Sequence, residues 1–342
     1  MSPGPLTGTR VVLLAGAGPA PFAGMLLRDL GAEIVRVDRP GSDTGVSGLP
    51  LRLDTRSRGV RSVTADLKSD EGRDVVHRLV ATADVFVDPY RPGVVERLGF
   101  DPKALCAAHP SLIYVHMTGW GHDGAWAQRA GHDINYLAVA GALYPTGSAD
   151  RPPLPPLNML ADYGGGGTYL VMGVLAALLE RTRTGRGAVL DVAMTDAVAS
   201  LTTLLHDMRA AGLWSDERES NIFDGGAPFY RTYRTADGGF MAVGAIEPAF
   251  HTALLTTLGI DPADWPQHDR ERWPAQRETL ARIFASRSRA EWEQIFADVD
   301  ACVTPVLSPA EAPGHPALAS RGTFVDRDGR AVPGPAPRRV IP

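Results

Sequence analysis

Residues 10–30 read RVVLLAGAGPAPFAGMLLRDL, and this stretch contains the pattern that decides the fold. Arg10–Leu14 is a short apolar run typical of a buried strand, and the glycines and prolines of residues 15–21 follow it as turn residues. The apolar spacing from Phe22 to Leu30 then predicts a helix. A strand, a tight turn and a helix in this order predict the first half of a β-α-β unit.

Apolar runs and helical patterns continue to alternate as far as residue 193. The further strands that we predict are Ile34–Val37, Ser62–Ala65, Val85–Val87, Leu112–His116 and Ala188–Ala193. Helices are predicted at Asp70–Ala83 and at Thr168–Arg181, and the second of these is apolar nearly all round, which indicates a buried helix. Because strands alternate with helices, we expect an α/β fold class with a mainly parallel sheet that helices cover on both faces.

The pattern changes after residue 225. Phe229–Tyr233 and Phe240–Val243 flank the sequence TADGG at 235–239, which is typical of a hairpin turn. Helical segments follow at Pro248–Leu258, Trp273–Ala285 and Ala290–Phe296. These elements predict a smaller α+β unit, and Ala197–Leu213 is expected to form one long helix that leaves the sheet and links the two parts.

Length and composition exclude several classes of protein. The chain has 342 residues, enough for a large and a smaller domain, and its net charge of -5 gives no electrostatic basis for binding nucleic acid. Cys106 and Cys302 lie too far apart in sequence to indicate a disulfide framework or a zinc site. Residues 1–5 lack the features of a secretion signal, and the apolar run Tyr169–Leu179 is too short to span a bilayer. We therefore expect a cytoplasmic protein that binds neither nucleic acid nor membrane.

Three further stretches carry residues suited to acid/base chemistry on a carbon acid. His132 stands in Gly131–Tyr136, where the apolar residues that follow predict the first turn of a helix around the histidine. Asp162 stands before the glycines at 164–167, and Glu247 follows the second strand of the predicted hairpin. A histidine can act as a base near neutral pH, and a carboxylate can supply a second base or orient the histidine.

Each of these residues also has a purely structural interpretation. A lone histidine is normally structural or exposed, Asp162 could cap the helix that begins at Thr168, and Glu247 could be an ordinary first-turn acid that the helix dipole favours. The residue types and their spacing leave these alternatives open.

Short segments along most of the chain match a known family, and the residues quoted above belong to the same collinear series. The segments are VV at 11–12, RVDRP at 36–40, ADLK at 65–68, YRPGV at 90–94, MTGWG at 117–121, PPLN at 155–158, DGGAPFY at 224–230 and DACVTPV at 300–306. With them the chain resembles the α-methylacyl-CoA racemases of the family III CoA-transferase (CaiB/BaiF) superfamily. A series of this length is more specific than any single motif.

The resemblance implies a large Rossmann-like CoA-binding domain, a small α+β domain and an interlocked homodimer. It places the large domain at 1–190 and 310–342, a linker helix at 191–225 and the small domain at 226–309. In such a dimer the active site forms between the large domain of one subunit and the small domain of the other.

The resemblance further implies an isomerase that moves the α-proton of a 2-methylacyl-CoA thioester between the two faces of the carbon, as branched-chain fatty acid metabolism requires. His132 and Asp162 would be the two acid/base groups, and Glu247 would orient and stabilise His132. The backbone N–H of Asp133 would face the thioester oxygen, and Asn158 would support the site. No metal or redox cofactor is implied, because CoA enters as part of the acyl-CoA substrate.

A larger set of residues matches the CoA-binding positions of the family: Arg39, Ala65, Asp66, Leu67, Arg91 and Arg97. The resemblance implies that Arg39 approaches a CoA phosphate and that the other two arginines lie near the CoA, a role that suits guanidinium groups. The three residues at 65–67 would line the adenine pocket.

Two alternatives stay within the same fold. A CoA-transferase would use Asp162 as a nucleophile, whereas the pair of His132 and Glu247 favours the racemase. A non-catalytic CoA-binding protein is suggested by one departure from the family pattern, because Leu13 stands where relatives usually carry glutamate. In a second departure, His122 stands in a loop that usually contains glutamine, where it could change access to the acyl channel.

A third alternative is an NAD-dependent dehydrogenase. Gly16 and Gly18 after the first strand, with Asp38 at the end of the second, resemble part of a dinucleotide fingerprint. The third glycine of that fingerprint is absent, and Pro21 stands in its place without a backbone donor.

Overall fold

The computed structural model describes residues 4–41 and 54–338, and their contacts define two compact units. The first unit contains residues 4–41, 54–143, 155–203 and 335–338, and the second contains residues 144–154 and 204–334. The segments 144–154 and 310–334 therefore group with the second unit, whereas the limits implied by the resemblance assigned both to the large domain. Those domain limits stay a prediction.

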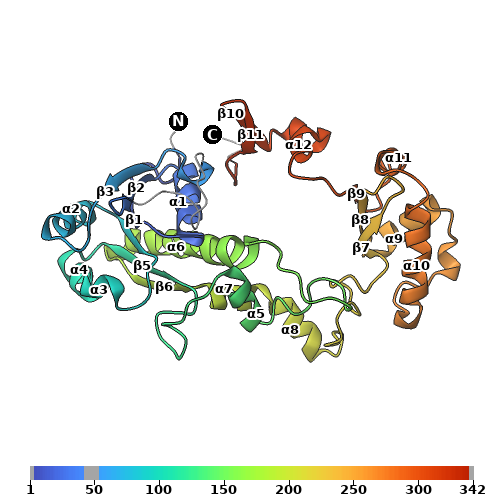
Figure 1. Ribbon diagram of the computed structural model, residues 1–342, viewed down its shortest axis with the longest axis horizontal. Coiled ribbons are helices and arrows are strands. Elements are labelled where there is room, and N and C mark those ends of the chain that lie inside the picture. Colours follow the sequence, from blue (N-terminus) through green and yellow to red (C-terminus); the bar gives the residue numbers. More distant parts are fainter. Residues whose placement is uncertain (1–3, 42–53, 339–342) are drawn as a thin grey trace. The chain divides into compact units, whose positions relative to one another are not determined.

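A six-stranded parallel sheet forms the centre of the first unit (Figure 1). Its strands are β1 (Arg10–Leu14), β2 (Glu33–Asp38), β3 (Arg61–Thr64), β4 (Val85–Asp88), β5 (Ile113–Thr118) and β6 (Val189–Ala193). They lie in the order β3-β2-β1-β4-β5-β6, which is the order of a doubly wound Rossmann sheet. Each strand predicted for this part of the chain is present, so the α/β fold class is confirmed.

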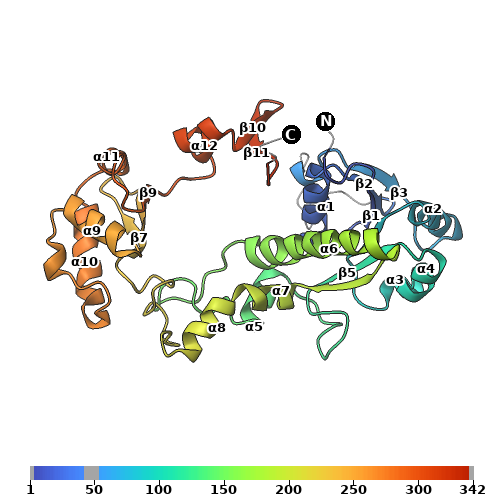
Figure 2. The same ribbon diagram turned by 180° about the vertical axis from the view of Figure 1, so that it is seen from behind.

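Helices cover both faces of this sheet, because alternate strand residues point to opposite sides. The helices are α1 (Pro19–Asp29), α2 (Asp70–Val80), α3 (Val94–Arg97), α4 (Pro102–Ala108), α5 (Asp133–Val139), α6 (Thr168–Thr184) and α7 (Met194–Leu201), with the short turn η1 (Thr55–Ser57) and the π-helical segment η2 (Met159–Gly167). Val11 and Leu13 share a core with residues of α1 and α6, whereas Val12 and Leu14 share one with residues of α2 and α4 (Figures 1 and 2).

Helix α6 is buried on one face only, which corrects the prediction of a helix buried all round. Leu170 and Val174 are in the core, but Met172, Leu175 and Leu179 are 55%, 37% and 66% exposed. Apolar composition therefore did not distinguish a buried helix from one that presents an apolar face to solvent. No helix among the described residues is both long and apolar enough to cross a membrane.

The single long helix predicted at Ala197–Leu213 is instead two helices, α7 and α8 (Thr203–Ala210). The hydroxyl of Thr202 donates to the carbonyl of Ala199 at 2.8 Å, and the hydroxyl of Thr203 donates to that of Ser200 at 2.7 Å. Such local bonds compete with the helical backbone pattern and favour a bend at this point. The predicted linker helix is therefore broken between Leu201 and Thr203.

The second unit has a three-stranded antiparallel sheet with helices packed against it. Its elements are β7 (Tyr230–Arg234), β8 (Phe240–Gly244), β9 (Val303–Pro305), α9 (Pro248–Thr257), α10 (Trp273–Phe284), α11 (Arg289–Ile295), α12 (Pro316–Arg321), the hairpin β10 (Phe324–Arg327) and β11 (Arg330–Pro333), and the short turns η3 (Pro262–Asp264), η4 (Arg270–Arg272) and η5 (Ala312–Gly314). The core is rich in aromatic residues, with Tyr233 stacked on Phe284 at 5.0 Å between ring centroids. The predicted hairpin and the predicted α+β unit are confirmed.

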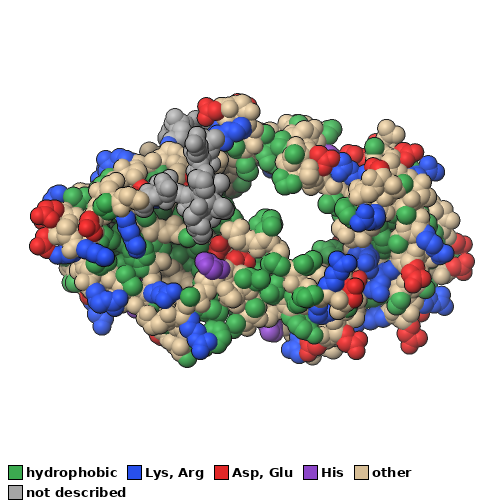
Figure 3. Space-filling model, viewed as in Figure 1, with side chains coloured by type: hydrophobic (Ala, Val, Ile, Leu, Met, Phe, Trp, Pro, Cys, Tyr) green, Lys and Arg blue, Asp and Glu red, His purple; other side chains and the backbone are tan. Residues whose placement is uncertain are grey.

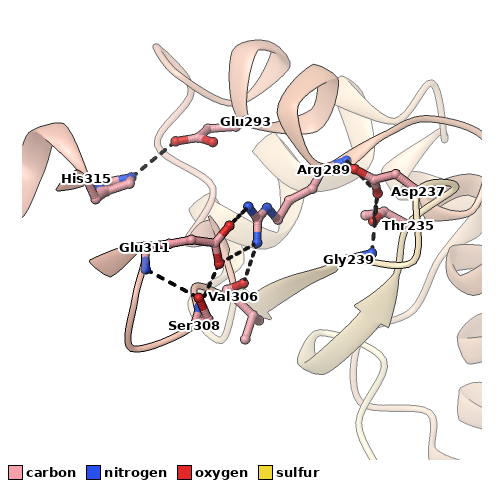
Figure 4. Close-up of polar contacts among 9 residues, drawn as sticks. All are labelled: Thr235, Asp237, Gly239, Arg289, Glu293, Val306, Ser308, Glu311 and His315. Carbon is pink, nitrogen blue, oxygen red and sulfur yellow. Dashed lines mark hydrogen bonds and ion pairs between the residues drawn. The ribbon is translucent and has the colours of Figure 1, made fainter. Parts of the chain in front are cut away.

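A polar cluster at the start of α11 ties three parts of the second unit together (Figure 4). The guanidinium of Arg289 pairs with Glu311 and donates to the carbonyl of Val306 at 3.0 Å, and its backbone N–H donates to Asp237 at 3.2 Å. Hydrogen bonds from Arg289 lower the pKa of Glu311 to about 2, and a bond from Thr235 lowers the pKa of Asp237. We call these five residues the Arg289 network.

Candidate active site

A cavity of about 280 Å³ lies at the carboxyl ends of the strands in the first unit. It is lined by residues 17–19 after β1, 89–92 after β4 and 117–120 at the end of β5, together with residues 127 and 129–131, His132, Tyr136, Asp162 and Met194. The strand order reverses between β1 and β4, and ligands of doubly wound proteins bind at this switch point. The cavity therefore lies where this fold normally places its ligand.

His132 is the N-cap residue of α5, so it immediately precedes the helix and does not lie in its first turn, where the sequence predicted it. Its backbone N–H donates to the side-chain oxygen of Asn135 at 3.0 Å. The side chain is exposed and lines the cavity. The structure therefore places the predicted histidine at a helix end, with its imidazole accessible from the cavity.

Asp162 lines the same cavity from η2, so the two predicted acid/base groups face one space. Its carboxylate accepts a hydrogen bond from the amide nitrogen of Asn158 at 3.2 Å. Burial raises the pKa of Asp162, against the lowering effects of the Asn158 bond and of the charges on His132 and Arg56. Gly167, not Asp162, precedes α6, so the helix-cap interpretation of Asp162 is wrong.

The glycines after Asp162 allow η2 to pack against neighbouring helices. A Cβ atom on Gly166 would lie 2.9 Å from the Cβ of Pro19, and one on Gly167 would lie 2.6 Å from a ring carbon of Phe22. These two glycines therefore leave room for α1, and this close packing brings Asp162 to the cavity.

Gly18 lies directly against the Asp162 carboxylate, a contact that sequence analysis missed. A Cβ atom on Gly18 would lie 2.8 Å from Oδ2 of Asp162, and Gly18 has a φ of 63°. The sequence indicated a turn at Gly18 but gave no signal of its neighbour, which lies far away along the chain.

Asp133 connects the helix that carries His132 to the segment that carries Asp162. Its Oδ2 accepts the backbone N–H groups of Ala161 and Asp162, each at 2.8 Å. Its Oδ1 is buried and has no hydrogen-bond partner among the described residues. Burial raises the pKa of Asp133 despite the two bonds, which lower it. The side chain therefore supports the site, while the predicted role of the Asp133 backbone N–H stays a prediction.

Glu247 belongs to the second unit, where it immediately precedes α9 and is exposed. It lies near Cys302, whose pKa is raised by burial and then by the charges of Asp300 and Glu247. The proposed pairing of Glu247 with His132 stays a prediction.

Two of the predicted CoA-binding arginines lie at or beside the cavity. Arg91 lines it and donates to the carbonyl of Gln128 at 3.3 Å. Arg39 follows β2, and its guanidinium lies 5.1 Å from the ring centroid of Tyr90, which also lines the cavity. Arg97 is exposed on α3 and does not line the cavity.

The three residues predicted to line the adenine pocket follow β3. Ala65 and Leu67 are buried in the core, so their side chains face away from solvent. Asp66 is exposed and accepts the backbone N–H of Lys68 at 3.0 Å. Of these three residues, only Asp66 is exposed to solvent.

The two departures from the family pattern occupy different surroundings. Leu13 is buried in the core beside Gly24. The ring of His122 lies 4.0 Å from that of His116, and its Nε2 lies 3.3 Å from Glu96. Neither residue lines the cavity.

Asp38, the acid of the dinucleotide alternative, is already engaged by neighbouring side chains. It is buried, pairs with Arg36 at 2.9 Å and accepts the hydroxyl of Ser62 at 2.5 Å. A carboxylate with these partners is poorly placed to bind a ribose. The geometry therefore gives no support to an NAD site.

Comparisons with known proteins agree with this arrangement. The model of "CoA-transferase family III" matches residues 6–341. The chain is 48% identical to "Alpha-methylacyl-CoA racemase" of Mus musculus, covering 98% of this chain and 86% of the relative, and 46% identical to that of Homo sapiens, covering 97% and 86%. A crystal structure of a CAIB/BAIF family protein from Brucella suis is similar, with a TM-score of 0.83 at 30% identity, covering 99% of this chain and 93% of that one. The chain belongs to CoA-transferase family III.

Proposed function

We propose that this protein is an α-methylacyl-CoA racemase that inverts the α-carbon of 2-methylacyl-CoA thioesters by 1,1-proton transfer. The observation that carries the proposal is that His132 and Asp162 line one cavity at the switch point of the sheet. The names of the mouse and human relatives support the choice of reaction.

The proposed mechanism needs two groups that reach opposite faces of one carbon. One of His132 and Asp162 removes the α-proton, and the electron pair moves onto the thioester oxygen to form an enolate. The backbone N–H of Asp133 stabilises that oxygen. The other group then returns a proton to the opposite face, and each group changes protonation state once per turnover.

The electrostatics of the cavity suit this exchange. The pKa of Asp162 is raised by burial, which makes its carboxyl group a better proton donor near neutral pH than an ordinary aspartate. His132 supplies the partner group, because an imidazole ring can both accept and donate a proton. Asn158 and Gly18 hold the Asp162 carboxylate in place.

CoA binding supplies the affinity that positions the reacting carbon. Arg91 at the cavity and Arg39 beside Tyr90 are the proposed contacts to CoA, with Arg97 and the segment 65–67 further along the same edge of the sheet. Binding energy at these remote contacts would hold the thioester between the two bases. The proposed reaction uses no metal or redox cofactor, and CoA enters with the substrate.

We propose that the chain acts as a cytoplasmic homodimer. The exposed apolar side chains of Met172, Leu175 and Leu179 on α6 support an interface with a second copy. In that dimer, Glu247 of one subunit would orient His132 of the other.

A CoA-transferase remains the alternative function, with Asp162 as a nucleophile that forms a mixed anhydride. Incubation with a single epimer of a 2-methylacyl-CoA in deuterated water, without any acceptor acid, distinguishes the two. We expect formation of the other epimer with deuterium at C2. No change until a free acid is added would favour the transferase, and no change in either condition would favour a non-catalytic binding protein.

A further inference from the structure

Tyr136 packs across the backbone that leads into His132. Its side chain is almost fully buried, and its ring lies 4.8 Å from that of Trp120 in an edge-to-face contact. A Cβ atom on Gly119 would lie 2.3 Å from this ring, and one on Gly131 would lie 2.7 Å from it. Only glycine leaves room for the ring at these two positions, so Tyr136 fits tightly against the end of β5 and the loop before α5.

The hydroxyl of Tyr136 holds one side of the peptide group that joins Gly131 to His132. It donates to the carbonyl oxygen of Gly131 at 2.6 Å. The N–H of the same peptide group belongs to His132 and donates to the side-chain oxygen of Asn135 at 3.0 Å. Both polar atoms of this peptide group are therefore held by side chains of α5, which limits its rotation.

We infer that Tyr136 is a positioning residue that fixes the backbone of His132 and thereby aims its imidazole at the reacting carbon. The inference rests on the proposed racemase function. Because the His132 side chain is exposed, its direction depends mainly on the backbone that carries it. A displacement of about 1 Å in a catalytic group can cost roughly 100-fold in rate.

Two other roles for Tyr136 fit the structure less well. As a proton donor to substrate it would have to release a proton that already bonds to Gly131, and burial followed by the charge of Asp162 raises its pKa to about 12. As a purely structural residue it would depend on its ring and not on its hydroxyl. The hydroxyl can be removed without loss of the ring, so these roles are separable.

The test compares Tyr136→Phe with Tyr114→Phe, a matched control. Tyr114 is also buried in the first unit, and its hydroxyl also donates to a backbone carbonyl, that of Phe100 at 3.2 Å, but it does not line the cavity. We expect Tyr136→Phe to lower kcat about tenfold with KM changed less than twofold, and Tyr114→Phe to leave both unchanged.

Isotope effects separate positioning of His132 from a general loss of structure. Epimers deuterated at C2 report how far each deprotonation limits the rate. Tyr136→Phe should raise the isotope effect only for the epimer that His132 deprotonates, and Asn158→Ala only for the epimer that Asp162 deprotonates, because Asn158 bonds to Asp162. Equal changes for both epimers in Tyr136→Phe would overturn the inference.

A readout in the free protein separates this inference from the proposed function. In protein labelled selectively at histidine, His132→Ala identifies the NMR signals of the His132 imidazole. We expect Tyr136→Phe to shift or broaden these signals, with Tyr114→Phe leaving them in place. Unchanged signals in Tyr136→Phe would refute the positioning role even if the wild type is an active racemase. Changed signals in a protein without racemase activity would retain that role and refute the proposed function.

Discussion

Carboxyl groups behave in opposite ways in two regions of this molecule. In the first unit, burial raises the pKa values of Asp162, which lines the cavity, and of Asp133 behind it, despite the hydrogen bonds that each accepts. In the Arg289 network of the second unit (Figure 4), hydrogen bonds lower the pKa values of Asp237 and Glu311, which are both exposed to solvent. On the surface of the second unit, acidic and basic side chains lie interspersed (Figure 3).

The difference shows which groups are suited to proton transfer and which to holding the chain together. A carboxylate whose charge is compensated by close donors keeps that charge and acts as a fixed link. A carboxyl group held in a partly buried cavity changes charge more readily near neutral pH. Substitutions in the two regions should therefore affect different properties, activity at the cavity and stability in the Arg289 network. Their effects on the thermal midpoint at pH 7 should have opposite signs.

The largest expected effect is on activity at the cavity. His132→Ala and Asp162→Asn should each lower the rate of epimer inversion at least about 1,000-fold, because each removes one of two obligatory proton-transfer groups. Glu311→Gln, in the Arg289 network, should leave the rate within twofold. Chiral analysis of the 2-methylacyl-CoA product measures all three. An Asp162→Asn variant with the activity of Glu311→Gln would show that the carboxyl group at the cavity is not required for proton transfer.

Gly18→Ala tests the contact that holds Asp162. The added methyl group would lie 2.8 Å from the carboxylate, so we expect the carboxylate to move and kcat to fall about 10- to 100-fold. Gly185→Ala is the matched control, because Gly185 also has a positive φ, 68°, and its added Cβ would meet nothing within 4 Å. Steady-state kinetics at a temperature where both variants are folded gives the comparison. Equal losses in the two variants would show that backbone strain alone is responsible.

Arg289→Ala tests the second region. It removes the partner of Glu311 and the bond to the Val306 carbonyl, so we expect the thermal midpoint to fall by a few degrees. Racemisation at 25 °C should be unchanged. Calorimetry and the inversion assay on the same preparation measure the two effects. A loss of activity without a change in midpoint would assign a functional role to the network.

The smallest expected effects concern the pH dependence of stability, and they differ in sign. Glu311 has a folded pKa of about 2 against an ordinary 4.5, so its contribution to stability is present above pH 4.5 and is lost as the pH falls toward 2. Asp162 has a raised pKa, so its ionisation destabilises the fold above the ordinary value of 3.8.

Glu311→Gln should therefore lower the thermal midpoint at pH 7 and have little effect near pH 2. Asp162→Asn should raise the midpoint at pH 7 by a few degrees, and this gain should disappear near pH 3, where the wild-type carboxyl is protonated in both states. Thermal unfolding at the two pH values checks both. A destabilised Asp162→Asn variant at pH 7 would contradict the interpretation that burial dominates at this carboxylate.

Local sequence pattern predicted the parallel sheet well, because its buried strands contain short runs of apolar residues, such as Val85, Phe86 and Val87 of β4. It failed where side chains act on the backbone. The helix that apolar spacing predicted is interrupted where the hydroxyls of Thr202 and Thr203 bond to the backbone. Helix α6 was wrongly predicted to be buried because its exposed face is also apolar.

The site was predictable only in part. His132 and Asp162 could be proposed from the family resemblance, but their meeting in one cavity depends on contacts between distant segments. The bonds from Asp133 to the backbone of residues 161 and 162, and the contact of Gly18 with Asp162, join residues far apart along the chain. No local pattern reports such contacts. Tyr136 belongs to the segment Gly131–Tyr136 that drew attention to His132. The positioning role inferred for Tyr136 depends, however, on the hydrogen bond from its hydroxyl to Gly131, which only the structure shows.

Isotope exchange in the single-base variants gives the most direct test of two opposed proton-transfer groups. Each epimer of a 2-methylacyl-CoA is incubated in deuterated water with His132→Ala and with Asp162→Asn, and deuterium at C2 is measured by NMR. If the two groups face opposite sides of the carbon, each variant exchanges the α-proton of one epimer without inversion, and the two variants exchange different epimers. Exchange of the same epimer by both variants, or inversion by either, would contradict that arrangement.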